Sequence, residues 1–415
     1  MESYLGDVDV DLLGRMRACA AKPSLGRMPM IQIEGAYATA TVYTVSGDAH
    51  VIDDHARAQI QMICDTEACS GSRIRVMPDV HAGKVGPIGL TMTVGDSVLP
   101  ALVGNDIGCG VSAVEVKAKK GIDFAKLDKV VRESVRPQSG SLRREGADAE
   151  LIDVRDLLSG LRCGEHVQVK RALSAVGTLG GGNHFIELDR GGDGRIFLVV
   201  HSGSRILGTQ VYEWYMQAGG QKLKEAGIKV PREMVWLEDE LLDDYLVDMR
   251  LVCRFAELNR CAMLRRILRG MKWKAVPQAD GSTTITCAHN YIGSDGILRK
   301  GAISAHLGET VLIPSNMRDG IILGVGRGNE AWNYSAPHGS GRILKRSDVA
   351  DLHTLSEFKR EMHGIWSSSM SAETLDEAPF AYRELGQIRS AIGETVDIID
   401  TLKPMYNYRM RRDEA

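Results

Sequence analysis

Four histidines lie beside glycine, asparagine or serine, residue types that let backbone and solvent approach closely. They are His184, His201, His289 and His338. With Asp106 and Cys109, which share one glycine-rich turn, they can supply the nitrogen, sulfur and oxygen ligands of a divalent transition metal. For that turn alone, a buried free cysteine beside a turn-forming aspartate is an equally good interpretation.

These residues belong to six polar, glycine-rich segments placed where predicted strands end. The segments are 77–84 (MPDVHAGK), 104–110 (GNDIGCG), 177–187 (GTLGGGNHFIE), 201–205 (HSGSR), 288–291 (AHNY) and 335–342 (SAPHGSGR). The glycine run 177–182 indicates a phosphate cradle, because successive backbone N–H groups can converge on an anion there, although a merely tight loop is the alternative. Arg205 and Arg342 each follow a histidine by four residues and could pair with phosphate.

The composition is that of a soluble globular protein. Of 415 residues, 44% are apolar and 25% are charged. No segment approaches the roughly 20 apolar residues that span a bilayer, so a membrane role is not expected. The N-terminus has no secretory signal pattern and the eight scattered cysteines form no CxxC pair, so we expect a reducing, cytoplasmic environment without disulfides.

The net charge of −3 gives no overall attraction to phosphate. Any nucleic-acid contact must therefore come from a local basic patch. Candidates are Arg143, Arg144, Lys345, Arg346, Arg409, Arg411 and Arg412. For any one of them, a solvated surface charge is the competing interpretation.

The apolar patterns predict one α+β domain over residues 1–415, with a β-sheet core that carries the active site and helices around it. Strands are expected at 74–77, 89–94, 99–103, 196–200 and between 283 and 325. Helices are expected within 123–174, around a polar surface loop at 138–146, and at 210–226, 238–269, 348–363 and 380–402. The part from 348 to 403 is thus predicted to be helical. In the longest helix, Leu242, Tyr245, Met249, Val252 and Ala256 share one face, which predicts packing.

In this order, the segments closely resemble the RtcB family of RNA ligases. The resemblance covers about 77–342 and rests on GNDIGCG, GTLGGGNHFIE, HSGSR and PHGSGR, whose chance co-occurrence in one chain is negligible. It implies an RtcB-type domain. Its catalytic motifs would lie within 77–342.

The resemblance also implies roles for individual residues. Cys109 would bridge two manganese ions, with His201 and His289 completing one site and Asp106 and His184 the other. His338 would be the nucleophile toward GTP, and Asp79 would orient its imidazole. Nucleotide contacts would come from Asn183, Glu187, Ser315, His338, Gly339, Ser340, Gly341, Arg342 and Arg409. Because thiolate and imidazole suit zinc as well, manganese is implied by the resemblance alone.

The activity implied is a 3′-phosphate/5′-hydroxyl nucleic acid ligase in RNA splicing or repair. It would join RNA 2′,3′-cyclic phosphate or 3′-phosphate ends, such as those of tRNA halves, to 5′-hydroxyl ends. The reaction would pass through a covalent His–GMP intermediate and an RNA-3′-ppG intermediate. The family also suggests an archease-type activator as a partner.

Three departures from the family pattern concern the nucleotide site. Leu298 stands where a histidine is common, residues 313–317 read IPSNM, and Arg409 replaces a C-terminal lysine that contacts guanine in relatives. Arginine keeps the charge but changes the donor geometry, so nucleotide preference is expected to differ. Two other functions fit part of the pattern: a dinuclear-metal RNA phosphoesterase or nuclease, and a non-catalytic RNA-binding protein.

Overall fold

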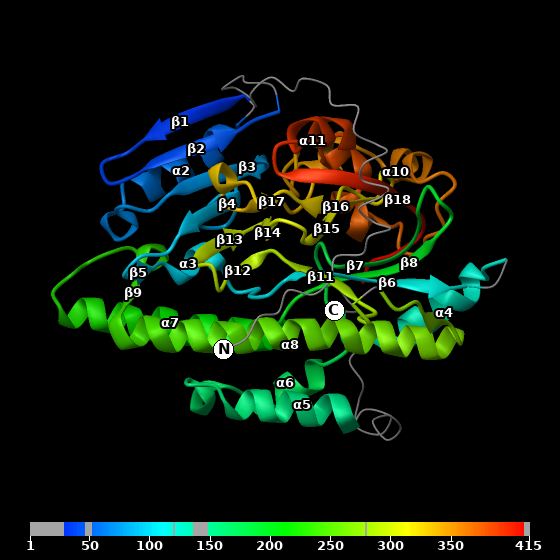
Figure 1. The fold of residues 1–415 in the computed structure, drawn as a ribbon, viewed down its shortest axis with the longest axis horizontal. Coiled ribbons are helices and arrows are strands. Elements are labelled where there is room, and N and C mark those ends of the chain that lie inside the picture. Colours follow the sequence, from blue (N-terminus) through cyan, green and yellow to red (C-terminus); the bar gives the residue numbers. More distant parts are fainter. Residues whose placement is uncertain (1–28, 46–51, 119–120, 136–147, 279, 411–415) are drawn as a thin grey trace.

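The computed structural model describes residues 29–45, 52–118, 121–135, 148–278 and 280–410. Helices and strands alternate irregularly along these residues and pack together, which confirms the predicted α+β class (Figure 1). The predicted loop at 138–146, with Arg143 and Arg144, and the tail residues Arg411 and Arg412 lie outside the described residues. Within the described part, no helix is both long and apolar enough to cross a membrane.

The larger sheet has eight strands and contains most of the histidine-bearing segments. Its order is β10-β6-β8-β7-β18-β16-β15, and β11 also pairs with β6. The strands are β6 (Gly110–Lys117), β7 (Phe185–Arg190), β8 (Ile196–Ser202), β10 (Lys274–Ala275), β11 (Ile285–Ala288), β15 (Thr310–Pro314), β16 (Ile321–Gly326) and β18 (Val396–Tyr408). Alternation along β7 sends Ile186 and Leu188 to one apolar cluster and Phe185 to another on the opposite face.

The second sheet has six strands in the order β1-β2-β3-β4-β13-β12, with only β2 and β3 parallel among these described pairs. Its strands are β1 (Met30–Glu34), β2 (Thr39–Tyr43), β3 (Ile74–His81), β4 (Ile88–Thr93), β12 (Asn290–Ile292) and β13 (Ile297–Lys300). Two small sheets pair β5 (Ser97–Val98) with β9 (Leu237–Glu238) and β14 (Ala302–Ser304) with β17 (Ser335–Pro337).

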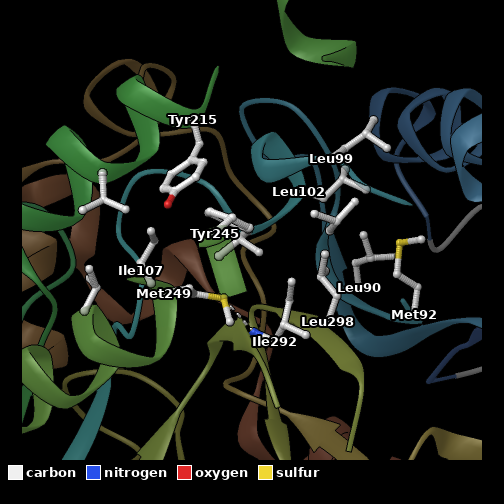
Figure 2. Packing of buried hydrophobic residues seen from close by; sticks show 14 of the residues in the cluster. Leu90, Met92, Leu99, Leu102, Ile107, Tyr215, Tyr245, Met249, Ile292 and Leu298 are labelled. Atoms are coloured by element: carbon white, nitrogen blue, oxygen red, sulfur yellow. Dashed lines mark hydrogen bonds between the residues drawn. The ribbon is translucent and has the colours of Figure 1, made fainter. Parts of the chain in front are cut away.

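Two long helices, α7 (Arg205–Glu225) and α8 (Asp239–Met271), pack against each other, and α8 runs beneath strands of both sheets (Figure 1). The predicted packing face of α8 is buried, as expected. Figure 2 shows Tyr245 and Met249 of this face among Ile107, Ile292 and Leu298. Ile107 belongs to the segment that carries Asp106 and Cys109, so the core of the protein anchors that segment.

Shorter helices complete the described structure. They are α2 (Asp54–Cys64), α3 (Pro100–Val103), α4 (Phe124–Val135), α5 (Asp148–Ser159), α6 (Val169–Ala175), α9 (Val349–Leu352), α10 (Leu355–Glu361) and α11 (Leu385–Ala391). Single 3-10 turns occur at Glu67–Cys69, Gly164–His166, Arg232–Met234, Glu330–Trp332, Ala372–Glu377 and Pro379–Ala381.

Two predicted elements are wrong. The apolar run 99–103 is the helix α3 and not a strand, because Pro100 at its first position favours a helical turn and a short buried run does not distinguish the two. The helix predicted at 380–402 is only α11, and β18 follows it. Residues 396–401 are rich in β-branched side chains, which favour a strand. The part from 348 to 403 is therefore not wholly helical.

Candidate active site

Five of the six residues singled out as metal ligands or nucleophile meet in two groups that share Cys109. Cys109, His201 and His289 form one group, and Asp106, Cys109 and His184 form the other, with the ligand atoms of each group within 4.8 Å of one another. The Cys109 Sγ lies 3.3 Å from His201 Nε2 and 3.4 Å from His184 Nε2. His201 Nε2 lies 3.0 Å from His289 Nε2, and His184 Nε2 lies 3.3 Å from Asp106 Oδ2.

The sheet register explains why these residues converge. Val111 pairs with His201 across β6 and β8, and His201 also pairs with Phe185 across β8 and β7. The loops that carry Cys109 and His184 lead into β6 and β7 and therefore end beside His201, which lies within β8 and not beyond its end. Ala288 pairs with Gly110, which brings His289 to the same edge of the sheet.

Glycines let the loops of the centre approach closely. Gly108 has a φ of +71°, and a Cβ there would lie 2.7 Å from the Cα of Cys253 on α8. A Cβ at Gly203 would overlap the Asp106 carboxylate. The turn from Asp106 to Cys109 thus sits directly on α8, and its carboxylate sits directly on the loop after β8.

The charges of the centre favour a bound cation. Burial lowers the pKa of His201 well below its usual value, and the neighbouring His289 and His184 lower it further. Burial, with the nearby His338, lowers the pKa of His289 to about 3. Neutral imidazoles carry lone pairs, and Nε2 atoms of His201 and His289 that face each other across 3.0 Å repel unless a proton or a cation lies between them.

The donor set fits a pair of divalent transition metals. His201 Nδ1 lies 3.2 Å from the carbonyl oxygen of Asn183; donation of the Nδ1 hydrogen there leaves the Nε2 lone pair facing Cys109. Burial, and then Asp106, raise the pKa of the Cys109 thiol well above its usual value, and a coordinated cation would reverse this shift. Burial opposes ionisation of Asp106, but the hydrogen bond and charge of His184 outweigh it and lower the pKa to about 2.

His338 lies beside this centre and is held by one carboxylate. Its ring centroid is 4.8 Å from that of His289. Its Nδ1 lies 2.8 Å from Oδ2 of Asp79, a fully buried residue of β3, and the Gly339 N–H donates to the same oxygen across 3.3 Å. Because the carboxylate accepts the Nδ1 hydrogen, the Nε2 lone pair is left for chemistry.

A cavity of about 680 Å³ opens next to His338. Its lining includes every residue for which the family resemblance implies a nucleotide contact: Asn183, Glu187, Ser315, His338, Gly339, Ser340, Gly341, Arg342 and Arg409. His201 and His289 of the metal-ligand candidates line it too, as do Lys345 and Arg346 of the basic candidates and His81. The volume is in the range of small-molecule and cofactor sites.

Glu377, for which no motif in the sequence suggests a role, contacts three arginines of this cavity. Its carboxylate accepts hydrogen bonds from Arg409 Nη1 at 2.8 Å and the Tyr382 hydroxyl at 2.5 Å, pairs with Arg346, and lies 3.6 Å from Arg342 Nη1. Burial opposes its ionisation, but the three guanidinium groups, Arg409 first, outweigh burial and lower the pKa. Glu377 lies in a 3-10 turn with no motif around it, so only its partners identify it.

Glu187 lies deep in the cavity wall. Asn407 on β18 donates to Glu187 Oε1 across 2.5 Å. Burial raises the pKa of Glu187 to about 7 against the opposing charge of Arg409. Arg409 lies over the ring of Phe185 and donates to the carbonyl oxygen of Asn183, so Arg409 is tied to the loop of His184.

The glycine run 177–182 and Arg205, both considered as phosphate contacts, bond instead to other parts of the protein. The N–H groups of Gly177 and Thr178 donate to the side-chain oxygen of Asn259, which favours a tight loop over a phosphate cradle for 177–182. Arg205 donates to Thr178 Oγ1 at 3.3 Å and packs on Gly180. Leu298, the departure on β13, is buried in the core.

Comparisons with known proteins show the family of the chain. The model of the family described as tRNA-splicing ligase RtcB matches residues 59–152 and 125–410. The chain is 30% identical over 360 residues to the RNA-splicing ligase RtcB of Escherichia coli K12, covering 80% of this chain and 88% of that protein. It is 25% identical over 401 residues to the tRNA-splicing ligase RtcB of Pyrobaculum aerophilum, covering 76% of this chain and 83% of that protein.

Proposed function

The chain belongs to the RtcB family of tRNA-splicing ligases, and from this premise we propose that it is a GTP- and manganese-dependent RNA ligase. It joins RNA ends that carry a 2′,3′-cyclic phosphate or a 3′-phosphate to ends that carry a 5′-hydroxyl, in RNA splicing or repair. An archease-type activator and a cytoplasmic location are proposed on the family likeness alone.

The observation that carries the proposal is the pair formed by His338 and Asp79 beside the cavity. In the first step, the His338 Nε2 lone pair attacks the α-phosphorus of GTP. A P–N bond forms, the bond from the α-phosphorus to the bridging oxygen breaks, and pyrophosphate leaves. Asp79 stabilises the positive charge that develops on the ring through the Nδ1 hydrogen.

The RNA steps return His338 to its starting state. A 3′-phosphate oxygen of the RNA attacks the same phosphorus, the P–N bond breaks, and RNA-3′-ppG forms. The 5′-hydroxyl oxygen of the second RNA then attacks the RNA 3′-phosphorus and GMP leaves, which makes the new phosphodiester. A cyclic phosphate must first be hydrolysed to a 3′-phosphate.

The metal ligands and the cavity wall have separate tasks in this proposal. Cys109 would be shared by two manganese ions, with His201 and His289 on one and Asp106 and His184 on the other, and the ions would neutralise charge on the triphosphate. Asn183, Ser315 and residues 339–342 would bind phosphates or the sugar, and Glu187 and Arg409 would bind the base.

A ligation assay with defined RNA ends tests the proposal. With GTP and Mn²⁺, the wild-type chain should join a 3′-phosphate RNA to a 5′-hydroxyl RNA and should acquire label from α-³²P GTP, whereas His338→Ala should do neither. His353→Ala, on the short segment before α10, is the matched control and should behave as the wild type. Joining that proceeds without GTP would refute the proposal.

The alternative of a dinuclear-metal phosphoesterase, in which a metal-activated water would be the nucleophile, is weaker because the family to which the chain belongs is one of ligases. The same variants separate the two functions. If His338→Ala cleaves phosphate esters as fast as the wild type and the wild type joins no ends, the phosphoesterase replaces the ligase.

A further inference from the structure

Two consecutive polar residues lie buried in the middle of α8, the helix whose apolar face predicted only packing. Asn259 is 0% exposed and Arg260 is 1% exposed. A buried amide and above all a buried guanidinium are costly unless their hydrogen bonds are satisfied. The groups that bond to Asn259 and Arg260 therefore indicate the role of these two side chains.

Asn259 connects two loops that lead to metal-ligand candidates. Its Oδ1 accepts from the N–H groups of Gly177 at 2.7 Å and Thr178 at 3.1 Å, in the loop before His184. Its Nδ2 donates to the Thr178 carbonyl at 3.2 Å, the Ser202 hydroxyl at 3.3 Å and the Gly203 carbonyl at 3.2 Å. One side chain thus joins the loop before His184 to the residues just after His201.

Arg260 connects the remaining segments. Its Nη1 donates to the carbonyl oxygens of Gly108 and Ser202, each at 2.9 Å, and these residues adjoin Cys109 and His201 in the chain. Its Nη2 lies 3.2 Å from Thr286 Oγ1, three residues before His289, and its Nε lies 2.8 Å from Ser112 Oγ. The two side chains together reach the segments of all the candidate ligands.

We propose that Asn259 and Arg260 are positioning residues that set the spacing of the candidate ligands and thereby the affinity for divalent cations. Neither side chain bonds to a ligand atom among the described residues; both bond to the segments that carry the ligands. The inference rests on the proposed function, since it requires the metal pair. Ile107, a residue of the turn itself, packs with Tyr245 and Met249 of α8 and holds the turn from its apolar side (Figure 2).

The same helix offers a control. Arg254, six residues before Arg260, pairs with Glu257 of α8 at 2.7 Å. Neither residue adjoins a candidate ligand in the chain. Arg254→Lys and Arg260→Lys therefore make the same substitution on α8, away from the centre in one case and beside it in the other.

Manganese binding by the metal-free chain, measured by isothermal titration calorimetry with Mn²⁺, tests the inference. Arg260→Lys and Asn259→Ala should raise the dissociation constant roughly 10- to 100-fold, the usual effect of losing a group that supports metal ligands. Arg254→Lys should bind Mn²⁺ as the wild type does. Unchanged affinity in both Arg260→Lys and Asn259→Ala, or an equal loss in Arg254→Lys, would overturn the inference.

Hydrogen exchange on the wild type keeps the test decisive if a variant does not fold. Because linkage is reciprocal, Mn²⁺ should slow exchange of the Gly177 and Thr178 amides, which are bonded to Asn259. Exchange that Mn²⁺ leaves unchanged there would count against the inference. Cys109→Ala distinguishes failure of the proposed metal centre from failure of the positioning role. If Cys109→Ala binds Mn²⁺ as the wild type does, the proposed metal centre is wrong. If Cys109→Ala loses Mn²⁺ while Arg260→Lys and Asn259→Ala bind it normally, only the positioning role is wrong.

Discussion

Replacing Asp79 by asparagine should slow transfer of GMP to His338 while leaving the fold intact. The substitution keeps the size of the buried side chain but removes the charge that faces His338 Nδ1 across 2.8 Å. It also lets the amide N–H of the new side chain donate to Nδ1, which would place the ring hydrogen on Nε2 and block the nucleophile.

The expected magnitude follows from the lost hydrogen bond. A hydrogen bond to a charged group contributes about 1.5–3 kcal/mol. Since about 1.36 kcal/mol corresponds to a tenfold change in rate, the loss amounts to roughly 10- to 150-fold if the bond forms fully in the transition state. The Gly339 N–H, which donates to the same oxygen, loses its charged acceptor as well and adds to the effect.

A single-turnover assay measures this step alone. Metal-loaded chain is mixed with α-³²P GTP, quenched in acid at successive times, and the protein-bound label is counted. Asp65→Asn, which alters an acceptor of the Ala36 N–H at the end of α2, is the control and should label at the wild-type rate. Equal labelling rates for Asp79→Asn and the wild type would refute the claim that Asp79 activates His338.

Three further predictions test other parts of the site. Cys109→Ala should lose both metal equivalents by elemental analysis, because Cys109 is common to both ligand groups, whereas Cys69→Ala, which removes another buried thiol, should keep them. Because the pKa of Glu187 is raised to about 7, its carboxylate forms as the pH rises; GTP affinity from equilibrium dialysis should increase roughly tenfold from about pH 6 to 8, and Glu187→Gln should show no such rise. Glu377→Ala leaves the buried guanidinium of Arg409 without its carboxylate partner and should lower the free energy of unfolding in urea by about 3–5 kcal/mol, while exposed Glu373→Ala should change it little; equal effects would contradict the role of Glu377.

Short motifs predicted the candidate metal ligands and the nucleophile better than the residues that hold them in place. Residues such as Cys109 and His338 stand in glycine-rich strings that mark them individually, and the order of those strings indicates the family. Asp79 and His338 are 259 positions apart, so their contact depends on the pairing of distant strands. Only the resemblance anticipated it.

Asn259, Arg260 and Glu377 could not be found in the same way. In an amphipathic helix, a polar residue is normally a solvated one, and nothing local distinguishes a buried asparagine that binds two loops. The wrong helix at 380–402 has a related cause. β18 is stabilised by pairing with β7 and β16. These hydrogen bonds join residues far apart in the sequence, so the only local sign of the strand is its β-branched residues.

The proposed function requires that distant loops meet around a pair of cations and leave the imidazole of His338 free to take a nucleotide. Tandem mass spectrometry of the chain after incubation with GTP and Mn²⁺ tests this requirement. We expect a single GMP adduct on the imidazole of His338, absent when Mn²⁺ is withheld. An adduct on a lysine, or on a histidine of the metal-ligand groups, would contradict it.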